Sequence, residues 1–440
     1  MTKKVYIETY GCQMNVADSE VIASILKANG FEMVDNINDA GLILINTCSI
    51  RENAEQRIWR RLKAISHLKR KNRNIVIGLT GCMAERLKEK VLEEERIVDI
   101  VAGPDSYRDL PLLVSEAETG HKAVNVLLSH EETYADISPV RLDRNGVTSF
   151  VSIMRGCNNM CAYCVVPYVR GAERSRDPET ILHEAEELFS SGYREVTLLG
   201  QNVDSYRHTK NGLSTGFPEL LEKVAGINPL MRVRFSTSHP KDISDDLIKT
   251  ISKHHNICKH IHLPAQSGSN RILKLMNREY TREWYMDRVS RIREYISDCS
   301  ISTDMITGFC TETEEDHQAS LSLMEWAGFD FAYMFMYSER PGTRASRKYS
   351  DNIPVEIKAR RLNEIISLQN KLSAISKKND VGKTFEVLIE GYSKRSSGYL
   401  SGRTSQNKVV VFPRREEKKG EYVNVQIEKC TSATLTGKVV

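Results

Sequence analysis

The sequence predicts an α/β protein with an N-terminal open parallel α/β domain, a central partial (β/α)6 barrel and a small C-terminal all-β barrel. Three observations predict this fold class. The first third of the chain contains strand-like runs that each end in a cysteine. Strand and helix patterns then alternate for about two hundred residues. The C-terminal part contains short strands with alternating polar and apolar residues. The expected domains span residues 1–120, 143–373 and 375–440.

Three N-terminal segments share one design. Each is a β-rich run that ends in a cysteine and leads into helix-like sequence: 4-KVYIETYGC-12, 41-GLILINTC-48 and 74-NIVIGLTGC-82. Parallel strands joined by helices end at the same sheet edge, so Cys12, Cys48 and Cys82 are expected to converge. A single cysteine of this kind is often only a small buried residue. Three in register favour a metal or cluster site.

The central barrel is expected after a polar loop at 129–146, which marks a domain boundary. A helix over 177–192 begins with Asp177 and Pro178 and ends at a glycine. Chemistry in such a barrel is expected at the C-terminal ends of its strands. The six predicted strands are 148–157, 195–202, 231–238, 259–266, 300–309 and 331–338.

The motif 156-GCNNMCAYC-164 follows the first barrel strand and holds Cys157, Cys161 and Cys164. A structural zinc site needs four ligands, and no fourth cysteine or histidine lies within a short loop of Cys164. Three thiolates on a cubane iron–sulfur cluster leave one iron open to a substrate or cofactor. A zinc site completed by a distant residue is the alternative.

The C-terminal segment, from about residue 383, predicts a β-barrel of the oligonucleotide-binding kind. The net charge of the whole chain is +4, and residues 375–440 hold thirteen Lys or Arg against seven Asp or Glu. This basic excess favours nucleic-acid contact or, alternatively, a solvated surface. The candidate RNA contacts are Lys394, Arg395, Tyr399 and Arg403. The alternative is that these four are simply exposed loop residues.

The apolar runs 42-LILI-45 and 409-VVVF-412 are too short to span a bilayer, and Glu8 interrupts the N-terminus where a signal peptide needs apolar residues. We therefore expect a cytoplasmic protein with no membrane contact. Ten cysteines in a chain of 440 residues then indicate reduced thiols, some of which bind metal.

A CxxxCxxC loop after the first strand of a six-fold barrel resembles the radical S-adenosylmethionine (SAM) superfamily. Residues 1–440 as a whole resemble its methylthiotransferases, which join an α/β domain with three separated cysteines, a radical SAM barrel and a TRAM domain, a small RNA-binding β-barrel. Three motifs resemble the MiaB branch, which modifies isopentenylated adenosine in tRNA: 8-ETYGCQMNVADSE-20, 163-YCVVPYVRGAERSR-176 and 198-LLGQNVDSY-206.

The resemblance implies two [4Fe–4S] clusters and SAM as cofactors. Cys157, Cys161 and Cys164 would hold the cluster whose open iron binds SAM, giving a radical that abstracts the C2 hydrogen of the adenine. Cys12, Cys48 and Cys82 would hold the cluster that carries the sulfur to be methylated and inserted. The implied partners are tRNA carrying isopentenyladenosine, an electron donor protein and a sulfur donor, and we expect a monomer.

Five residues are candidate SAM contacts because of their positions on the predicted barrel strands: Gln201, Asn202, Ser236, Gln266 and Asp304. Each could instead be a polar residue that completes the barrel mouth. Three arginines after the cysteine loop are candidates for RNA phosphate or the SAM carboxylate, with exposed salt bridges as the alternative: Arg170, Arg174 and Arg176.

The chain departs from the family at 308-GFCTET-313, where Cys310 and Thr311 replace the usual Pro-Gly. We interpret Cys310, and likewise Cys258, Cys299 and Cys430, as structural residues rather than ligands. The alternative functions are methylthiolation of threonylcarbamoyl adenosine in tRNA, methylthiolation of a ribosomal protein aspartate, and RNA binding by a non-enzymatic iron–sulfur protein.

Overall fold

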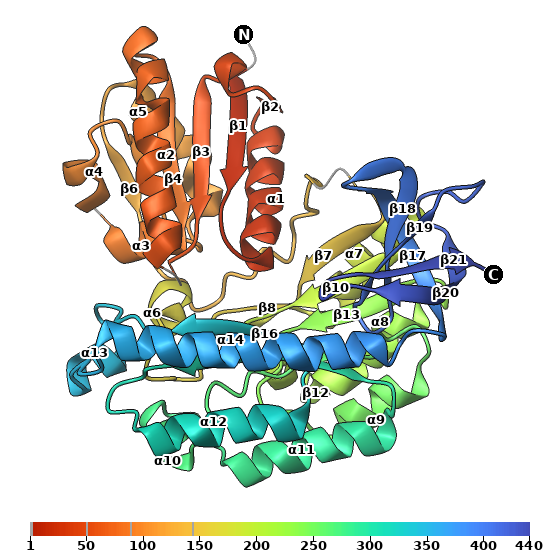
Figure 1. The fold of residues 1–440 in the computed structure, drawn as a ribbon. Helices are drawn as coiled ribbons and strands as arrows, with labels where there is room; N and C mark the ends of the chain where they lie inside the picture. The colour runs from red at the N-terminus through yellow and green to blue at the C-terminus, as the bar shows by residue number, and fades with distance from the viewer. Residues whose placement is uncertain (1–2, 50–51, 89, 143–144) are drawn as a thin grey trace. The chain divides into compact units, whose positions relative to one another are not determined.

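The structure is a computed structural model that describes residues 3–49, 52–88, 90–142 and 145–440 (Figure 1). The predicted start of the barrel domain, at residues 143 and 144, lies outside the described residues. The chain divides into two compact units, which we describe separately. Unit 1 comprises residues 1–144, 152–160 and 164–180, and unit 2 comprises residues 145–151, 161–163 and 181–440.

Unit 1 contains a six-stranded sheet with the order β2-β1-β3-β4-β5-β6, and all of its neighbouring strands are parallel. The open parallel domain is thus confirmed. Three of the strands were predicted, whereas β2, β5 and β6 are three-residue strands too short to give a sequence pattern. The strands are β1 (Lys3–Thr9), β2 (Phe31–Met33), β3 (Leu42–Thr47), β4 (Val76–Gly81), β5 (Ile100–Ala102) and β6 (Ala123–Asn125).

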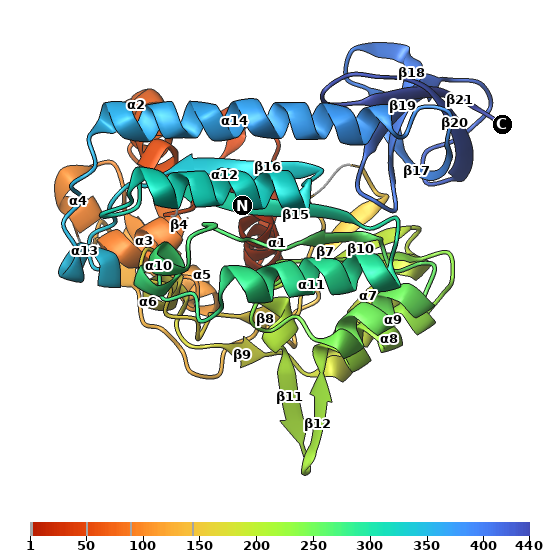
Figure 2. The same cartoon turned by 60° about the horizontal axis from the view of Figure 1, so that its bottom comes forward.

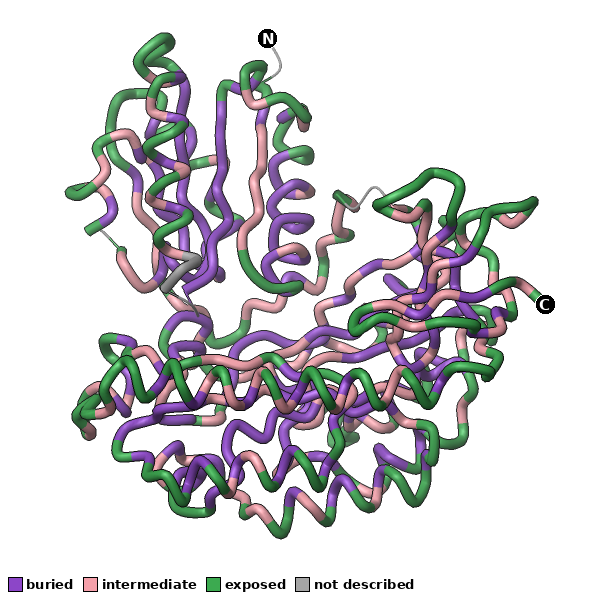
Figure 3. The backbone as a smooth tube through the Cα atoms, viewed as in Figure 1, coloured by how far each residue is buried: buried purple, intermediate pink, exposed green. Residues whose placement is uncertain are grey.

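Helices cover both faces of this sheet. One apolar cluster joins α1 and α5 to one face, and a second joins α2, α3 and α4 to the other. All residues of β3 and β4 are buried, as the purple tube in Figure 3 shows. These strands therefore read as continuous apolar runs. The helices are α1 (Gln13–Ala28), α2 (Glu52–Lys71), α3 (Cys82–Leu87), α4 (Lys90–Glu94) and α5 (Leu110–Glu118).

Unit 2 contains the predicted partial barrel, formed by two three-stranded sheets with the orders β13-β10-β7 and β14-β15-β16. A parallel bridge between Val233 and Ile257 links the first sheet to the segment that precedes β14. Each of the six expected strands is present, although all six are shorter than predicted: β7 (Thr148–Ser152), β10 (Glu195–Leu199), β13 (Arg232–Ser236), β14 (His260–His262), β15 (Ser300–Thr307) and β16 (Phe331–Met336).

Helices surround these strands, and the expected helix over 177–192 is α7 (Pro178–Ser190). Two elements were not predicted: the hairpin of β11 (Arg207–Lys210) and β12 (Leu213–Gly216), which projects in Figure 2, and the 24-residue helix α14. The other helices are α8 (Phe217–Gly226), α9 (Asp245–Lys253), α10 (Asn270–Leu275), α11 (Arg282–Tyr295), α12 (Glu314–Ala327), α13 (Arg344–Lys348) and α14 (Val355–Lys378).

The C-terminal segment forms the expected small β-barrel, which is closed in the order β17-β18-β19-β21-β20. Its apolar core includes Val387, Leu400 and Phe412. Two arginines of β13 attach this barrel to the rest of unit 2: Arg232 donates to the carbonyl of Arg403 (2.8 Å), and Arg234 donates to the carbonyl of Thr404 (2.7 Å). The strands are β17 (Thr384–Ser393), β18 (Ser396–Thr404), β19 (Val409–Pro413), β20 (Tyr422–Cys430) and β21 (Leu435–Val439).

Within the described part of the chain, no helix combines the length and the apolar character that crossing a bilayer requires.

Candidate functional site

Three cysteines follow three neighbouring strands of the unit 1 sheet. β3 lies between β1 and β4. Cys12 precedes α1, Cys48 directly follows β3, and Cys82 is the first residue of α3. Cys48 and Cys82 are buried, whereas Cys12 is exposed. The parallel strands thus deliver all three cysteines to one edge of the sheet.

Two glycines allow these strand ends to approach closely. Gly11 has φ +133°, and a Cβ on it would lie 2.6 Å from the Cβ of Cys48. Gly81 has φ +87°, and a Cβ on it would lie 2.6 Å from the carbonyl oxygen of Thr47. Both positions therefore require glycine, for backbone conformation and for space.

Buried amides fix the same strand ends. Asn15 donates to the carbonyl of Thr47 (3.0 Å), and Asn46 donates to the carbonyl of Asn15 (2.9 Å) and to Ser19 Oγ (2.9 Å). The thiol of Cys12 donates to Asn15 Oδ1 (3.3 Å). Neither asparagine was among the predicted site residues, although an asparagine inside the apolar run of β3 was a signal.

A buried charge network adjoins Cys82. Asp18 accepts hydrogen bonds from Nη1 of Arg155 (2.8 Å) and Nη2 of Arg170 (2.7 Å), while Nε of Arg170 donates to Sγ of Cys82 (3.2 Å). Burial acts to raise the pKa of Asp18, but the two guanidinium groups hold that pKa below its ordinary value. Burial raises the pKa of the Cys82 thiol, and Arg170 offsets part of this effect.

The arginines after the cysteine loop are buried and bonded within the protein. Arg170 and Arg174 are 2% and 6% exposed, and Arg174 forms an ion pair of 2.7 Å with Asp105. Arg176 donates to the hydroxyl oxygen of Thr180 (2.9 Å). Of the two predicted roles the salt bridge is thus supported for Arg170 and Arg174, although these ion pairs are buried and not exposed.

The second group of cysteines lies between two short antiparallel strands, β8 (Met154–Arg155) and β9 (Arg174–Ser175). Gly156 begins the loop with φ +71°, and a Cβ there would lie 2.6 Å from the carbonyl oxygen of Gly171. The backbone N–H of Cys157 donates to that same carbonyl (3.1 Å). The start of the loop is therefore held tightly against the segment after α6 (Val166–Arg170).

Hydrogen bonds reach the other two cysteines of this loop. Sγ of Cys164 accepts from the backbone N–H of Val166 (3.4 Å). Sγ of Cys161 accepts from Nη1 of Arg278 (3.2 Å). Cys157 and Cys161 are each 8% exposed. Both sulfur atoms are thus held in place by donors outside the cysteine side chains.

The five SAM candidates belong to the barrel strands or to the residues just beyond them. Gln201 and Asn202 follow β10, Ser236 ends β13, and Gln266 follows β14. Asp304 instead lies in the middle of β15, where its Oδ1 is 3.4 Å from Nε2 of His262.

Three buried polar atoms near these strand ends lack a hydrogen-bond partner among the described residues: Asn202 Oδ1, Gln266 Oε1 and His239 Nε2. The other nitrogen of His239 accepts the backbone N–H of Lys241 (3.2 Å), so Nε2 carries the proton of the neutral ring. Burial lowers the pKa of His239 to about 2, which keeps the ring neutral. Two acceptors and one donor without partners fit a polar ligand such as SAM.

Asp204 and His239 were missed by the sequence analysis. Asp204 accepts from the hydroxyl of Ser238 (2.9 Å) and from the backbone N–H of His239 (3.1 Å). Burial raises the pKa of Asp204 to about 8, and nearby Asp242 acts in the same direction. The short polar run at residues 236–239, which begins at the last residue of β13, was the sequence signal for a polar site here.

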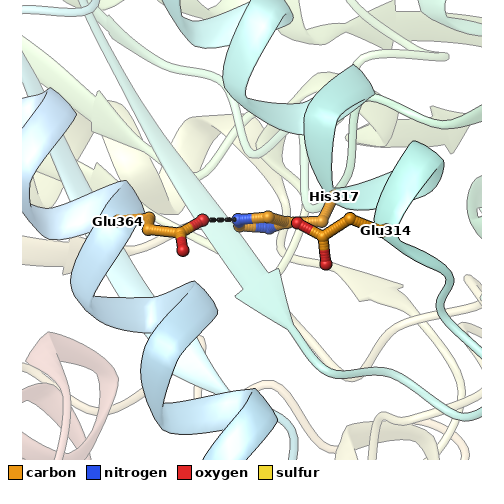
Figure 4. A group of neighbouring side chains, drawn as sticks. All are labelled: Glu314, His317 and Glu364. Atoms are coloured by element: carbon orange, nitrogen blue, oxygen red, sulfur yellow. Dashed lines mark hydrogen bonds and ion pairs between the residues drawn. The ribbon is translucent and has the colours of Figure 1, made fainter.

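A third cluster, of Glu314, His317 and Glu364, joins α12 to α14 (Figure 4). Nε2 of His317 lies 2.7 Å from a carboxylate oxygen of Glu364. Arg360 forms ion pairs of 2.7 Å with both Glu314 and Glu364. Arg361 also pairs with Glu314 (3.3 Å). Because two arginines already pair with these carboxylates, we interpret this cluster as a structural contact between the two helices and assign no metal to it.

The C-terminal barrel exposes the predicted basic and aromatic residues. Lys394 and Arg395 are exposed in the β17–β18 turn, and Tyr399 is also exposed. Arg403 is less available because it pairs with Glu390 (3.2 Å). An additional aromatic candidate is Tyr392, which is exposed, with the Arg414 guanidinium 5.0 Å from its ring centroid.

Two of the remaining cysteines, Cys258 and Cys310, are buried, whereas Cys299 and Cys430 are partly exposed. Cys310 is 1% exposed and belongs to an apolar cluster with Phe309 and Tyr337. Cys258 is also 1% exposed, and burial raises the pKa of its thiol to about 11. These environments suit inert buried thiols.

Sequence models of three protein families match the chain. They are the "Uncharacterized protein family UPF0004" over residues 4–103, the "Radical SAM superfamily" over residues 151–324 and the "TRAM domain" over residues 378–440.

Curated relatives match along the whole chain. A protein of Amoebophilus asiaticus (strain 5a2) is 57% identical over 452 residues, covering 100% of this chain and 93% of the relative. A protein of Phocaeicola vulgatus is 58% identical over 439 residues, covering 100% of this chain and 96% of the relative. Both are named "tRNA-2-methylthio-N(6)-dimethylallyladenosine synthase".

Solved structures share the fold at low sequence identity. The radical S-adenosylmethionine methyltransferase TsrM from Kitasatospora setae, with cobalamin and a [4Fe-4S] cluster bound, has a TM-score of 0.59 at 13% identity. That match covers 78% of this chain and 74% of TsrM. The cobalamin-dependent radical enzyme OxsB has a TM-score of 0.54 at 13% identity, covering 83% of this chain and 56% of OxsB.

Proposed function

Because this chain belongs to the tRNA-2-methylthio-N(6)-dimethylallyladenosine synthases, a family of radical SAM enzymes that transfer a methylthio group, we propose the same reaction for it. It inserts a methylthio group at C2 of N6-isopentenyladenosine next to the anticodon of tRNA. The proposed domains are 1–120, 143–373 and 375–440, and the ranges of the three matching families support them.

The observation that carries the proposal is the presence of two separate cysteine triads. Cys12, Cys48 and Cys82 follow adjacent parallel strands, and the second triad lies in one loop within nine residues. We propose that each triad ligates one [4Fe–4S] cluster, which leaves one iron open in each. The soft sulfur donors and the close strand approach at Gly11 and Gly81 fit the first cluster.

When bound, SAM and the two clusters supply a radical that can abstract the C2 hydrogen and the sulfur that is methylated and inserted. The residues of this chain bind and orient these groups. Cys157, Cys161 and Cys164 hold the SAM-binding cluster, and Arg278 positions Cys161 through its hydrogen bond.

We propose that SAM is oriented at the barrel mouth by Gln201, Asn202, Ser236, Gln266 and Asp304. The buried atoms without partners on Asn202 and Gln266 support this, because each offers an acceptor that a SAM ammonium or hydroxyl donor would satisfy. We add the Nε2–H of His239 as a donor for a SAM carboxylate or ribose oxygen.

For the substrate, we propose that tRNA binds to the TRAM barrel through Lys394, Arg395 and Tyr399, with Tyr392 as a further stacking residue. Their exposure and the basic excess of residues 375–440 support this surface. An electron donor protein and a sulfur donor complete the proposed partners. We propose a monomer that acts in the cytoplasm, where tRNA is its substrate.

The decisive experiment is an anaerobic assay of cluster-reconstituted protein with SAM, a strong reductant and tRNA bearing isopentenyladenosine, followed by nucleoside mass analysis. We expect a methylthio adduct on that base. Cys161→Ala should abolish 5′-deoxyadenosine and the adduct together. Cys12→Ala should abolish the adduct but retain 5′-deoxyadenosine formation, and Cys430→Ser is the control that should keep both.

The other outcomes identify the alternatives. 5′-Deoxyadenosine without an adduct would overturn the substrate, and tRNA with threonylcarbamoyl adenosine and ribosomal protein would then be assayed in parallel. Neither product, with iron at both triads, would favour a non-enzymatic RNA-binding protein. Bound zinc in place of iron would overturn the cluster assignment itself.

A further inference from the structure

A buried group of charges beside Cys82 carries an excess positive charge. It consists of three arginines and two aspartates whose side chains are at most 5% exposed: Arg155, Arg170, Arg174, Asp18 and Asp105. Each arginine pairs with an aspartate, but three cations against two anions give the group a net charge of +1. Such a charge is costly away from water, so the group indicates an anionic neighbour.

The neighbouring charged residues offset this excess only in part. Glu85 is 2% exposed and interacts with Asp105, but burial raises its pKa to about 7, so its carboxyl group is not fully ionised near neutral pH. Glu132 and Asp136 both pair with Arg108, which gives that group one excess negative charge. However, the side chains of Arg108 and Asp136 are 42% and 69% exposed, so water screens them.

Arg170 connects the charge group to sulfur. Its Nη2 bonds to Asp18 (2.7 Å), its Nε bonds to the sulfur of Cys82 (3.2 Å), and its Nη1 is a buried donor without a hydrogen-bond partner in the described chain. Arg155 donates to the other oxygen of Asp18 (2.8 Å), which fixes the Asp18 carboxylate. The guanidinium of Arg170 therefore cannot rotate away from Cys82 without breaking its own ion pair with Asp18.

We propose that Arg170 is a positioning residue that tunes the cluster held by Cys12, Cys48 and Cys82, raising its reduction potential and stabilising its retention. This inference rests on the cluster of the proposed function. A cluster with three thiolates is anionic, which matches the net positive charge of this group. Hydrogen bonds to cluster sulfur and nearby positive charge both favour the reduced state, which is the more negative one.

Arg174 provides a matched control within the same charge group. It is similarly buried and forms an ion pair with Asp105 (2.7 Å). Its other hydrogen bonds go to the backbone carbonyls of Ser129 and Arg170, not to a sulfur. Loss of Arg174 should therefore disturb packing as much as loss of Arg170, without removing a donor to sulfur.

The experiment uses the full chain with Cys157, Cys161 and Cys164 replaced by alanine, so that only the cluster of unit 1 remains. In this background, iron content, thermal unfolding and the midpoint potential by EPR-monitored titration are measured for Arg170→Gln, Arg170→Lys and Arg174→Gln. We expect a shift to more negative potential or loss of iron in Arg170→Gln and partial recovery in Arg170→Lys, which keeps the charge. Arg174→Gln loses the same charge but keeps the donor to Cys82, so its shift should be clearly smaller and its iron content should stay at the parent value.

Each other result overturns the proposal. An unchanged potential with full iron in Arg170→Gln would show that the hydrogen bond to Cys82 has no effect on the cluster. Equal loss of iron in Arg170→Gln and Arg174→Gln would show a purely structural network. Absence of iron already in the parent background would overturn the cluster assignment of the proposed function and the role of Arg170 with it, which separates this failure from the other two.

Discussion

Nη1 of Arg278 lies 3.2 Å from Sγ of Cys161, and the same guanidinium donates to the carbonyl of Pro264 (3.0 Å) and to the hydroxyl oxygen of Tyr280 (3.1 Å). Arg278 is 4% exposed. Every nitrogen of this side chain is therefore used, and one of its bonds reaches a cysteine of the CxxxCxxC loop. This gives the loop a fixed support from the residues that follow α10.

Replacement of Arg278 by alanine should weaken this support. We expect the free energy of unfolding to fall by about 1 to 3 kcal/mol, because buried acceptors lose their donor. Iron bound by the CxxxCxxC loop should also fall. Urea unfolding and iron analysis of the reconstituted protein measure both effects. Arg291→Ala, which removes a partly exposed ion pair with Glu294, is the control, and a wild-type iron content in Arg278→Ala would contradict the prediction.

Replacement of Gly81 by alanine should disturb the strand ends that carry the first triad. Gly30→Ala is a matched control, since Gly30 has φ +82° but open space around it, whereas Gly81 has φ +87° and close neighbours at Asn46 and Thr47. Gly30→Ala should lose about 1 kcal/mol from backbone strain. Gly81→Ala should lose more, because its φ of 87° with ψ of −158° is a conformation that is nearly confined to glycine. Gly81→Ala should lose a further 1 to 3 kcal/mol, roughly, from overlap, together with cluster iron. Equal unfolding free energies would refute the close approach.

Asp204 should make the protein less stable as the pH rises. Its pKa in the fold is raised to about 8 by burial, so between about pH 4 and 8 the unfolded chain releases a proton that the folded state keeps. This lowers the free energy of unfolding by up to about 1.4 kcal/mol per pH unit, and the loss ends above the folded pKa. Asp204→Asn should flatten the profile.

Urea unfolding of wild type and Asp204→Asn at pH 5 and pH 8 measures this difference. The variant should gain stability relative to wild type at pH 8 and gain less at pH 5. Asp246→Asn, at an exposed position of α9, should leave the profile unchanged. Parallel profiles for wild type and Asp204→Asn would mean that Asp204 is ionised in the fold.

Removal of Lys394 or Arg395 should weaken tRNA binding through charge. For each phosphate that the variant no longer neutralises, the slope of log affinity against log salt concentration should fall by about 0.7 to 0.9. Filter binding or anisotropy with unmodified tRNA at several salt concentrations measures this slope. Lys438→Ala, on the same barrel and paired with Glu428 at 3.1 Å, should keep the wild-type slope. The same slope in all three variants would place the RNA elsewhere.

Replacement of Thr311 by a residue that tolerates positive φ should make the protein more stable. Thr311 has φ +63°, a conformation that a β-branched side chain adopts at a cost, and its hydroxyl accepts from Arg271 (3.2 Å). Thr311→Asn keeps an acceptor and suits this conformation, so it should stabilise the protein by about 0.5 to 1 kcal/mol. Thr311→Val, which lacks the acceptor, should destabilise it. Thermal unfolding of both variants tests this, and a less stable Thr311→Asn would contradict the prediction.

Much of the fold was readable because its main strands are long apolar runs with turn residues between them. The strands β3 and β4 belong to this kind, and the barrel strands were located by their alternation with helical segments. The three-residue strands β2, β5 and β6 were not readable, because they give no periodicity; β14 is equally short and was found only as part of the longer extended segment 259–266. Helix α14 was also missed, although its 24 residues carry few helix-breaking signals.

The candidate site was only partly predictable for a related reason. Cysteine spacing and strand position located both triads, because those are local properties of the sequence. The partners of these cysteines are distant in sequence: Arg170 is 88 residues from Cys82, and Arg278 is 117 residues from Cys161. The burial of Asp204 and His239 likewise depends on packing that no short window of sequence contains.

The two arginines of β13 have a consequence for how this protein could be rearranged in evolution or by design. Arg232 and Arg234 are 3% and 8% exposed, and each donates to a backbone carbonyl of the C-terminal barrel. Arg232 also pairs with Glu386 of that barrel, and Arg234 pairs with Glu195 of β10. A chain shortened before β17 would uncover both cations on a strand of the catalytic barrel. The terminal barrel is therefore not an interchangeable attachment, and an exchange with another barrel succeeds only if the incoming one presents carbonyls to the same two side chains.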